Sequence, residues 1–451
     1  MRVNTTDTIV AIATAAGRGG IGVVRLSGPQ AFAIAARIAG RLPAPRMAAL
    51  RRLRDAQGAT IDQGLVLCFP APASFTGEDV VELHAHGGPV VLQWLVDAAC
   101  GHGARVARPG EFSERAFLND RIDLAQAEAI ADLIDAGSRA AVRAAQRSLD
   151  GALSQRVRAL ADTLLELRVH VEGALDFADE DIDWLADATL HARIQALCED
   201  LQRLLADSGR GRRLRDGFVV ALAGRPNVGK STLLNRLAGA EVAIVTDIAG
   251  TTRDVLREHI DLDGLPLTLI DTAGLRETED AVEREGVRRA RAAQDRAELV
   301  LFVSDAGECL DAADEALLRD LRADLLRIVV HNKCDLHGLV PARAERDGLV
   351  HLHLSAATGA GIELLIRELH RLAGFDERTE TAFSARARHV DALRRTLGFV
   401  SAAKARLGEG ANAELAAEEL RLAHEALGEI TGRVTSEDLL GAVFSRFCIG
   451  K

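Results

Sequence analysis

The sequence predicts a multidomain protein that combines α/β domains with an all-α domain. The chain has 451 residues, which is too long for one typical hydrophobic core. Between residues 216 and 375, short apolar runs alternate with helical patterns, which indicates a largely parallel sheet. Residues 122–210 and 384–445 carry apolar side chains at helical spacing and few turn signals. We therefore expect two helical segments that pack together, with the sheet domain inserted between them.

The composition is that of a soluble globular protein. Its hydrophobic fraction is 48%, its charged fraction is 27%, and no apolar run approaches the roughly 20 residues that span a bilayer. The six cysteines form no Cys-x-x-Cys pair, which argues against zinc and disulfides and makes the cytoplasm the expected location. Because the net charge is −11, an RNA partner would need a local basic surface. The arginines between residues 105 and 147, including Arg115, are the best candidates for that surface.

A glycine-rich loop follows the first strand of the predicted parallel sheet. The apolar run Phe218–Leu222 indicates a buried strand, the letters GRPNVGKS follow at 224–231, and a helical pattern begins directly afterwards. This is the motif G-x-x-x-x-G-K-[ST] in its strand–loop–helix context, where backbone N–H groups surround a phosphate. Lys230 would reach the β- and γ-phosphates, and the Ser231 hydroxyl would bind Mg²⁺. The predicted phosphate-binding residues are Asn227, Val228, Gly229, Lys230, Ser231 and Thr232.

Three later motifs stand at the ends of further predicted strands. The first is DTAG, in which an Asp can hold Mg²⁺ through water and a glycine N–H can meet the γ-phosphate. The second is NKCD, whose Asp335 carboxylate can accept hydrogen bonds from two N–H donors of guanine that adenine lacks. The third is SAA, a loop suited to closing over the base. The four motifs in this order predict a Ras-like P-loop domain that binds GTP and GDP. Their residues are Asp271, Thr272, Ala273, Gly274, Asn332, Lys333, Asp335, Ser355, Ala356 and Ala357.

The residue that should orient the attacking water is missing from its usual place. Ras-like switches have a Gln directly after DTAG-type motifs, whereas Leu275 stands here and forms no side-chain hydrogen bond. Acidic residues downstream are candidates for that role, namely Glu277, Glu279, Glu283 and Glu285. Positive charge at the transferred phosphate could come from Arg253, Arg276, a partner's arginine or a bound monovalent cation. Residues 246–254 stand where a first switch loop should be, and could coordinate both Mg²⁺ and a second cation.

With ALAGRPNVGKS, TDIAGTTRD, DTAGLRE, NKCD and the final CIGK, the sequence resembles the tRNA-modification GTPases of the MnmE (TrmE) family. The likeness runs almost end to end and includes GRGGIGVVRLSG, SFTGEDVVELHAHGGP and EITGRVTSEDLLGAVFSRFCIGK. It implies an N-terminal α+β domain that binds tetrahydrofolate and dimerises, a discontinuous helical domain, and an inserted P-loop GTPase domain. The expected boundaries are 1–119, 120–215, 216–375 and 376–451.

The resemblance also assigns roles in the GTPase domain. It implies GTP hydrolysis stimulated by K⁺, with Mg²⁺ contacts at Ser231 and Thr252 and water positioning by Glu283. The implied K⁺ contacts are Asn227, Thr246, Ile248 and Thr251. The nucleotide-binding switch residues are Thr246, Asp247, Ile248, Ala249, Gly250, Thr251 and Thr252.

A second site is implied for a folate, either 5-formyl- or 5,10-methylene-tetrahydrofolate. Its residues would be Arg25, Glu82, Arg121 and Lys451. The family more often has Lys where Arg121 stands, and the two cations differ in geometry. The tail places Cys448 where one-carbon chemistry could use a thiolate, either as a nucleophile or as part of the site lining. The sequence shows no base that would activate this thiol.

The implied reaction installs an aminomethyl or carboxymethylaminomethyl group at C5 of the wobble uridine of certain tRNAs. Redox steps would come from the FAD-dependent MnmG (GidA) protein, in a heterotetramer or larger complex with a homodimer of this chain. The sequence itself carries no flavin fingerprint after a strand. The alternatives are a ribosome-assembly or RNA-binding switch GTPase of the Era or Der type and a dynamin-like membrane GTPase. Neither the second module of the former nor an insertion segment of the latter is evident, so no membrane partner is expected.

Overall fold

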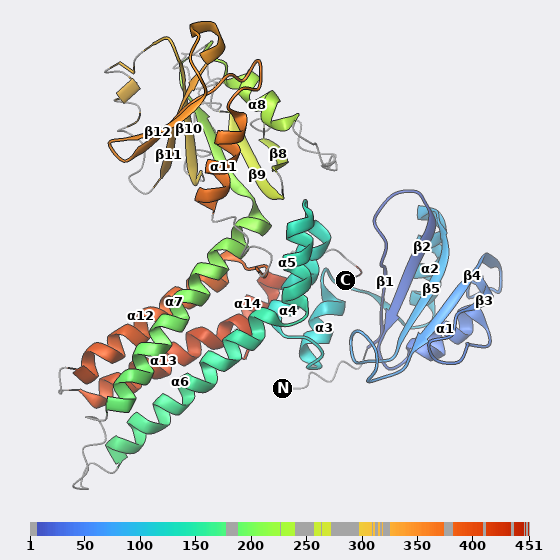
Figure 1. The fold of residues 1–451 in the computed structure, drawn as a ribbon. Helices are drawn as coiled ribbons and strands as arrows, with labels where there is room; N and C mark the ends of the chain where they lie inside the picture. The colour runs from blue at the N-terminus through green and yellow to red at the C-terminus, as the bar shows by residue number, and fades with distance from the viewer. Residues whose placement is uncertain are drawn as a thin grey trace, which may run out of the picture. The chain divides into compact units, whose positions relative to one another are not determined.

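The computed structural model describes residues 7–176, 188–225, 227–239, 257–262, 264–271, 297–308, 310–311, 314–315, 318, 325–373, 382–408, 412–433, 437–445, 447 and 450. The chain divides into two compact units (Figure 1). The first contains residues 1–131, 157–165 and 421–451, and the second contains residues 132–156 and 166–420. Both units are therefore built from segments that are distant in the sequence.

A six-stranded sheet forms the centre of the first unit, in the order β3-β4-β5-β2-β1-β6. Its strands pair antiparallel except β1 with β6. They are β1 (Ile9–Ile12), β2 (Gly19–Ser27), β3 (Ala49–Arg54), β4 (Thr60–Phe69), β5 (Val80–Gly87) and β6 (Arg105–Val106). The alternating pattern along β5 sends Val81 and Leu83 into the core and leaves Glu82 and His84 on the other face.

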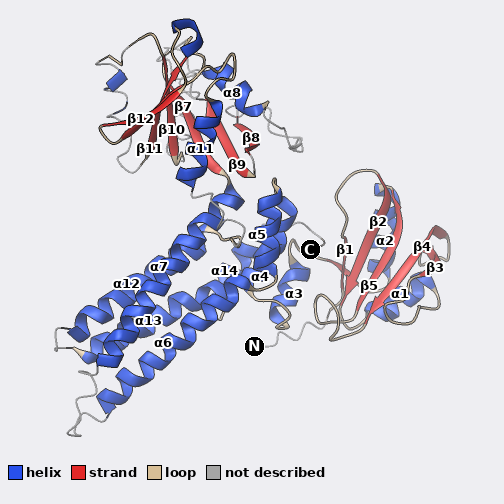
Figure 2. Cartoon of the chain, viewed as in Figure 1, coloured by secondary structure: helices blue, strands red, loops and turns tan. Residues whose placement is uncertain are grey.

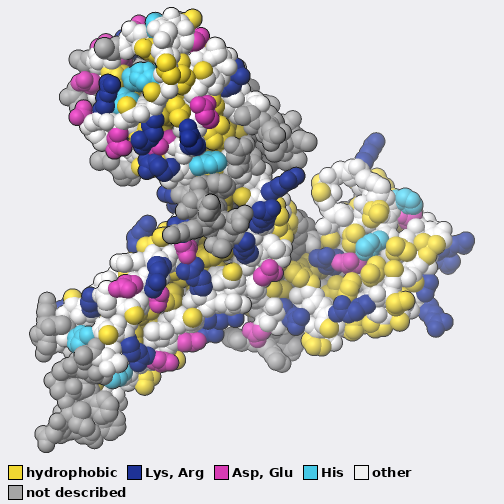
Figure 3. Space-filling view, viewed as in Figure 1, with side chains coloured by type: hydrophobic (Ala, Val, Ile, Leu, Met, Phe, Trp, Pro, Cys, Tyr) yellow, Lys and Arg dark blue, Asp and Glu magenta, His cyan; other side chains and the backbone are white. Residues whose placement is uncertain are grey.

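Two helices cover the core face of this sheet. They are α1 (Ala31–Ala39) and α2 (Pro89–Gly101), whose apolar residues Ile34 and Leu95 pack with the strands. The opposite face carries exposed apolar side chains (Figure 3). Among them are Leu50 on β3 and Leu65 on β4. Because Leu50, Leu65 and His84 are register partners across three strands, they form one row on that open face.

The end of the chain packs within the first unit. Helix α3 (Glu111–Leu118) contacts α14 (Glu437–Phe444), and an apolar cluster joins Phe444 and Phe447 to Leu124 at the start of α4 (Leu124–Asp135). Aromatic rings account for part of this contact, since the Phe444 ring centroid lies 6.3 Å from that of Phe117. The C-terminal segment is thus an integrated part of this unit.

Long helices flank the inserted part of the chain. They are α5 (Arg139–Leu149), α6 (Ala152–Asp176), α7 (Ala188–Asp216), α12 (Ala387–Gly408) and α13 (Ala413–Thr431). Helices α7 and α12 lie side by side in the second unit (Figure 2). This confirms the prediction that helical segments on either side of the sheet pack together. None of the helices in the described part of the chain is long and apolar enough to cross a membrane.

The inserted part of the second unit is a seven-stranded sheet in the order β12-β13-β11-β10-β7-β9-β8. All its strand pairs are parallel except those of the edge strands β8 and β12. The strands are β7 (Phe218–Ala223), β8 (Arg257–Leu262), β9 (Leu265–Asp271), β10 (Leu299–Asp305), β11 (Leu326–Asn332), β12 (Ala342–Arg346) and β13 (Leu349–His353). Helices α8 (Lys230–Ala238) and α11 (Ile362–Ala373) pack on its apolar core. The parallel order brings the carboxyl ends of β7, β9, β10, β11 and β13 to one edge, where ligands of such sheets bind.

Candidate functional site

The glycine-rich loop joins the end of β7 to the start of α8. Gly229 lies in the left-handed region at φ +96°, and a Cβ there would stand 2.3 Å from the Asn332 side-chain nitrogen. A side chain is therefore excluded at this position. Lys230 is buried, and its ammonium donates to the carbonyl oxygens of Gly224 at 2.7 Å and Arg225 at 2.6 Å. Ser231 and Thr232 are exposed at the N-terminus of α8. The loop thus curls around its own lysine at a helix N-terminus, as a phosphate-binding loop requires.

Asn332 at the end of β11 connects three of the predicted motifs. Its side-chain nitrogen donates to the carbonyl oxygen of Val228 at 2.8 Å, and its side-chain oxygen accepts from the backbone N–H of Ala356 at 2.9 Å. The side chain is buried, so both of its bonds are shielded from water. The phosphate loop and the predicted guanine-binding loops are consequently held to one another by a single amide.

The residues around the predicted guanine site are fixed by ion pairs and turns. Lys333 lies in the left-handed region at φ +66°, and its ammonium stands 2.9 Å from the carboxylate of Asp305 at the end of β10. The bond from Lys333 and those from Gly307 N–H and His337 lower the pKa of Asp305 to about 2, although its partial burial acts in the opposite direction. Asp335 is exposed on the short helix η1 (Cys334–His337), which leaves its carboxylate open toward a ligand.

The loop after β13 is held by a contact that the sequence did not predict. Arg236 on α8 donates to the carbonyl oxygen of Ala356 at 2.9 Å and also to that of Ala357. Ser355 is buried, and its hydroxyl accepts from the Thr358 N–H at 3.2 Å. Arg236 and Asp305 thus support the site from outside the motifs. The only signal for Asp305 was a carboxylate at a strand end, and Arg236 gave none.

Of the predicted DTAG motif, the structure describes the backbone of Asp271. Asp271 ends β9, where its backbone is in register with Leu222 of the strand that leads into the glycine-rich loop. The structure therefore places the backbone of Asp271 beside the strand that leads into the glycine-rich loop. The predicted residues outside the described ranges are Thr246, Asp247, Ile248, Ala249, Gly250, Thr251, Thr252, Thr272, Ala273, Gly274, Glu283, Cys448 and Lys451.

A second group of predicted residues meets on the open face of the six-stranded sheet. Arg25 on β2 and Glu82 on β5 are register partners, and two guanidinium nitrogens of Arg25 donate to one carboxylate oxygen of Glu82 at 3.0 and 2.8 Å. The other oxygen of Glu82 lies 3.2 Å from Nε2 of His84. The Arg25 guanidinium also stands over the rings of Phe75 and Phe112, with 5.9 and 5.8 Å to their centroids. This cluster offers a half-buried carboxylate, a cation and an aromatic ring together.

Arg121 and the C-terminal tail each make a close contact that involves a glycine of the first unit. The stem of Arg121 packs on Gly77, where a Cβ would stand 3.2 Å from its Cγ. Gly450 is buried at φ +100°, and a Cβ there would stand 2.1 Å from the carbonyl oxygen of Ile12. Because Ile12 directly follows the register partner of Arg25, the penultimate residue of the chain packs on the strand next to Arg25.

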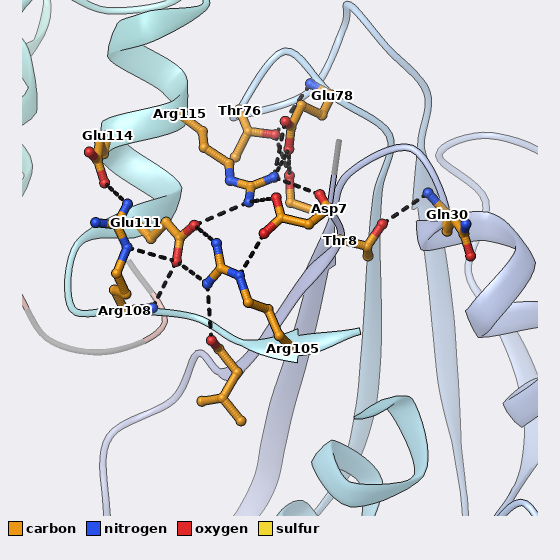
Figure 4. Close-up of polar contacts among 12 residues, drawn as sticks. Asp7, Thr8, Gln30, Thr76, Glu78, Arg105, Arg108, Glu111, Glu114 and Arg115 are labelled. Atoms are coloured by element: carbon orange, nitrogen blue, oxygen red, sulfur yellow. Dashed lines mark hydrogen bonds and ion pairs between the residues drawn. The ribbon is translucent and has the colours of Figure 1, made fainter. Parts of the chain in front are cut away.

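A buried ion-pair network lies between this sheet and α3 (Figure 4). The Arg115 side chain is only 2% exposed and binds the carboxylates of Asp7 at 2.8 Å, Glu78 at 3.1 Å and Glu111 at 3.1 Å. Burial alone would raise the pKa of Glu111, but bonds from Arg105, the Arg108 N–H and Arg115 lower it to about 2. The prediction that Arg115 belongs to a tRNA-facing surface is therefore wrong, because its charge is buried and neutralised within the protein.

Comparisons with known proteins agree with this architecture. The family described as "MnmE helical domain" matches residues 124–448, and that described as "GTP-binding protein TrmE N-terminus" matches residues 8–121. The chain is 53% identical over 451 residues to the tRNA modification GTPase MnmE of Stutzerimonas stutzeri (strain A1501), with 99% of each chain covered. It is 50% identical over 451 residues to the tRNA modification GTPase MnmE of Hydrogenovibrio crunogenus, with 100% of each covered. A solved structure of Aquifex aeolicus Era with GDP and AlF4⁻ is 26% identical, with 40% of this chain and 66% of that chain covered and a TM-score of 0.27. Such a partial likeness to Era says nothing about activity, whereas the two relatives named MnmE match over the full length. The chain belongs to the MnmE family of tRNA modification GTPases.

Proposed function

We propose that this protein is a K⁺-stimulated GTPase that modifies tRNA together with an FAD-dependent partner. It would install a (carboxymethyl)aminomethyl group at C5 of the wobble uridine of certain tRNAs, using a one-carbon unit of tetrahydrofolate. The observation that carries the proposal is the full-length identity of 50–53% to proteins named tRNA modification GTPases. The geometry of the glycine-rich loop around Lys230 supports the GTP part of it.

In the GTPase domain we assign Mg²⁺ to Ser231 and Thr252, and the orientation of the attacking water to Glu283. Ser231 is exposed at the helix N-terminus, where its hydroxyl is free to meet a metal bound to the phosphates. The K⁺ ion would supply the positive charge that stabilises the transferred phosphate in the absence of an arginine finger. Its proposed ligands are Asn227, Thr246, Ile248 and Thr251, while Asp271, Thr272, Ala273 and Gly274 would contact Mg²⁺ and the γ-phosphate.

For the folate we propose Arg25, Glu82, Arg121 and Lys451. The side chains present fit this ligand, because a carboxylate pairs with the N–H donors of a pterin edge and cations pair with its glutamate tail. Both bonds from Arg25 go to one oxygen of Glu82, so the other oxygen, beside His84, has acceptor capacity left for the ligand. The packing of Gly450 on Ile12 supports a role for the adjoining tail residues Lys451 and Cys448. When bound, the folate supplies the one-carbon unit, and the protein's residues bind and orient it.

The proposed assembly is a homodimer in the cytoplasm that joins the FAD-dependent MnmG protein and tRNA. The row of Leu50 and Leu65 on the open sheet face supports dimerisation through the N-terminal domain. The four cysteines in the described residues are free, as a reducing compartment requires. The proposed domain boundaries are 1–119 for the folate-binding domain, 120–215 and 376–451 for the helical domain, and 216–375 for the GTPase domain.

The proposal predicts that cells lacking this protein lose the modified wobble uridine of its substrate tRNAs. Nucleoside mass spectrometry of total tRNA measures this directly. Complementation with the wild-type gene should restore the modified nucleoside, whereas the variant Cys448→Ser should restore much less of it and yet hydrolyse GTP normally. Unchanged wobble-uridine modification in the deletion strain would contradict the proposed function. Full rescue by Cys448→Ser would remove that residue from the one-carbon site.

The assigned K⁺ site predicts that GTP turnover depends on the monovalent cation. We expect turnover in KCl to exceed that in NaCl at the same ionic strength by at least about tenfold, because a charge at the transferred phosphate lowers the barrier. Replacing Asn227 with alanine should remove most of this difference while leaving the low NaCl rate. Steady-state phosphate release measures both. Equal rates in the two salts would exclude the cation.

A further inference from the structure

The loop between β4 and β5 exposes an aromatic ring and buries the hydroxyl side chains on either side of it. Phe75 is 37% exposed, whereas its neighbours Ser74 and Thr76 are 9% and 0% exposed. Burial of polar groups and exposure of a phenyl ring is the reverse of what the hydrophobic effect favours. Specific contacts must therefore hold this loop in a form that leaves the ring at the surface.

Hydrogen bonds to the buried side chains hold the loop in this form. The Thr76 hydroxyl lies 2.7 Å from that of Ser27, which also donates to Glu78 at 2.7 Å. The Ser74 hydroxyl donates to the carbonyl oxygen of Glu78 at 2.5 Å. Glu78 is in turn bound by the buried guanidinium of Arg115 (Figure 4). The outward position of Phe75 is thus fixed in advance by the rest of the domain.

The exposed ring lies in the cluster assigned to the folate. The Arg25 guanidinium stands over Phe75 and is bonded to Glu82, so ring, cation and carboxylate share one place. On the other side of the loop, Gly77 packs against the stem of Arg121. The loop that carries the ring therefore contacts two of the residues assigned to the folate, Arg25 and Arg121.

We infer that Phe75 is a specificity-determining residue that stacks on the pteridine ring of the folate. A flat heterocycle whose N–H edge binds Glu82 can be held by an apolar surface that stacks on one of its faces. Phe75 is an exposed aromatic ring that shares the contact with Arg25 with that carboxylate. Stacking of a heterocycle on an aromatic side chain is worth about 1–3 kcal/mol by alanine substitution, which corresponds to about 5- to 150-fold in affinity. This inference rests on the folate part of the proposed function.

Calorimetric titration of the full-length protein with (6S)-5-formyltetrahydrofolate tests the inference. We expect Phe75→Ala to weaken binding by about 10- to 100-fold and Phe75→Leu by somewhat less, because leucine keeps the apolar surface without the flat ring. Phe75→Tyr should bind like the wild type. Val90→Ala is the matched control, since it removes another exposed apolar side chain from the same domain, on the helix α2 that covers the opposite face of the sheet. It should leave the affinity unchanged.

The outcomes separate this inference from the proposed function. Wild-type affinity in both Phe75→Ala and Phe75→Leu would overturn the stacking role and leave the folate site standing. A loss of dimer in Phe75→Ala, measured by analytical ultracentrifugation, with unchanged folate affinity would also overturn it and assign the ring to an interface. Absence of binding to the wild type itself would contradict the folate proposal, and this inference with it.

Discussion

Replacing Glu283 with alanine is expected to lower GTP turnover by about 100- to 10,000-fold. A side chain that is positioned to orient or deprotonate a reactant accelerates a reaction by about this factor. The position after the DTAG motif holds Leu275, which can neither accept nor donate a hydrogen bond. Another residue must therefore orient the attacking water, and we assign this role to Glu283. The loss should appear in kcat, because water positioning matters in the transition state and adds little to ground-state binding.

The nearby Glu279 provides a matched control for this experiment. The Glu279→Ala variant removes a carboxylate from the same acidic segment and should hydrolyse GTP close to the wild-type rate. Both variants should bind a fluorescent GDP analogue with wild-type affinity, since neither residue belongs to the phosphate loop or the guanine motifs. Single-turnover phosphate release in KCl gives the rate of the chemical step. Normal turnover in Glu283→Ala, or a slow Glu279→Ala, would move the role to another residue of the segment.

The strand, loop and helix order around each GTP motif was predictable because each motif is contiguous in the sequence. A glycine-rich loop must follow a strand and precede a helix, and the guanine carboxylate must stand at a strand end, so local order almost determines the site. The bridge made by Asn332 was not predictable in this way. Its partners Val228 and Ala356 lie in other motifs, and only the order of the strands in the sheet brings them together.

The N-terminal domain shows where reasoning from sequence stops. The arginine-rich stretch suggested a basic surface, but a count of arginines does not say which carboxylates they meet. The partners of Arg115 include Asp7 and Glu78, which are 108 and 37 residues away in the chain. An apolar residue such as Phe75 is equally ambiguous in a sequence, because only its surroundings decide whether its ring packs in the core or lines a ligand site.

The second large effect is expected on stability. Replacing Arg115 with methionine should lower the free energy of unfolding of the N-terminal domain by about 3–5 kcal/mol. Loss of Arg115 removes a guanidinium from the buried carboxylates of Glu78 and Glu111, of which Glu111 keeps its ion pair with Arg105. Removing one partner of a buried ion pair costs far more than removing a surface pair. The matched control is Arg108→Met, because the Arg108 side chain is 65% exposed and its ion pairs, with Glu114 at 3.0 Å and Glu111 at 3.6 Å, are formed by a solvent-exposed guanidinium. These pairs should contribute no more than about 1 kcal/mol.

Tryptophan fluorescence can report on this domain alone. The chain has two tryptophans, so a Trp184→Phe background leaves Trp94 on α2 of the first unit as the only one. Urea unfolding followed by Trp94 then gives the stability of the unit that contains the network, in the full-length protein. Arg115→Met with wild-type stability in this background would show that the network contributes little.

The same measurement should reveal the network through its dependence on pH. Glu111 has a pKa of about 2 in the folded protein, below its ordinary value, and hydrogen bonds from Arg105 and Arg115 likewise lower the pKa of Asp7 against the effect of its burial. Carboxyls with lowered pKa values stabilise the fold fully above their unfolded pKa, near 4, and this contribution is lost as the pH falls toward 2. Arg115→Met removes part of the lowering, so the difference in stability between wild type and variant should be larger at pH 7 than at pH 4. A difference that is the same at both values would attribute the loss to packing and not to charge.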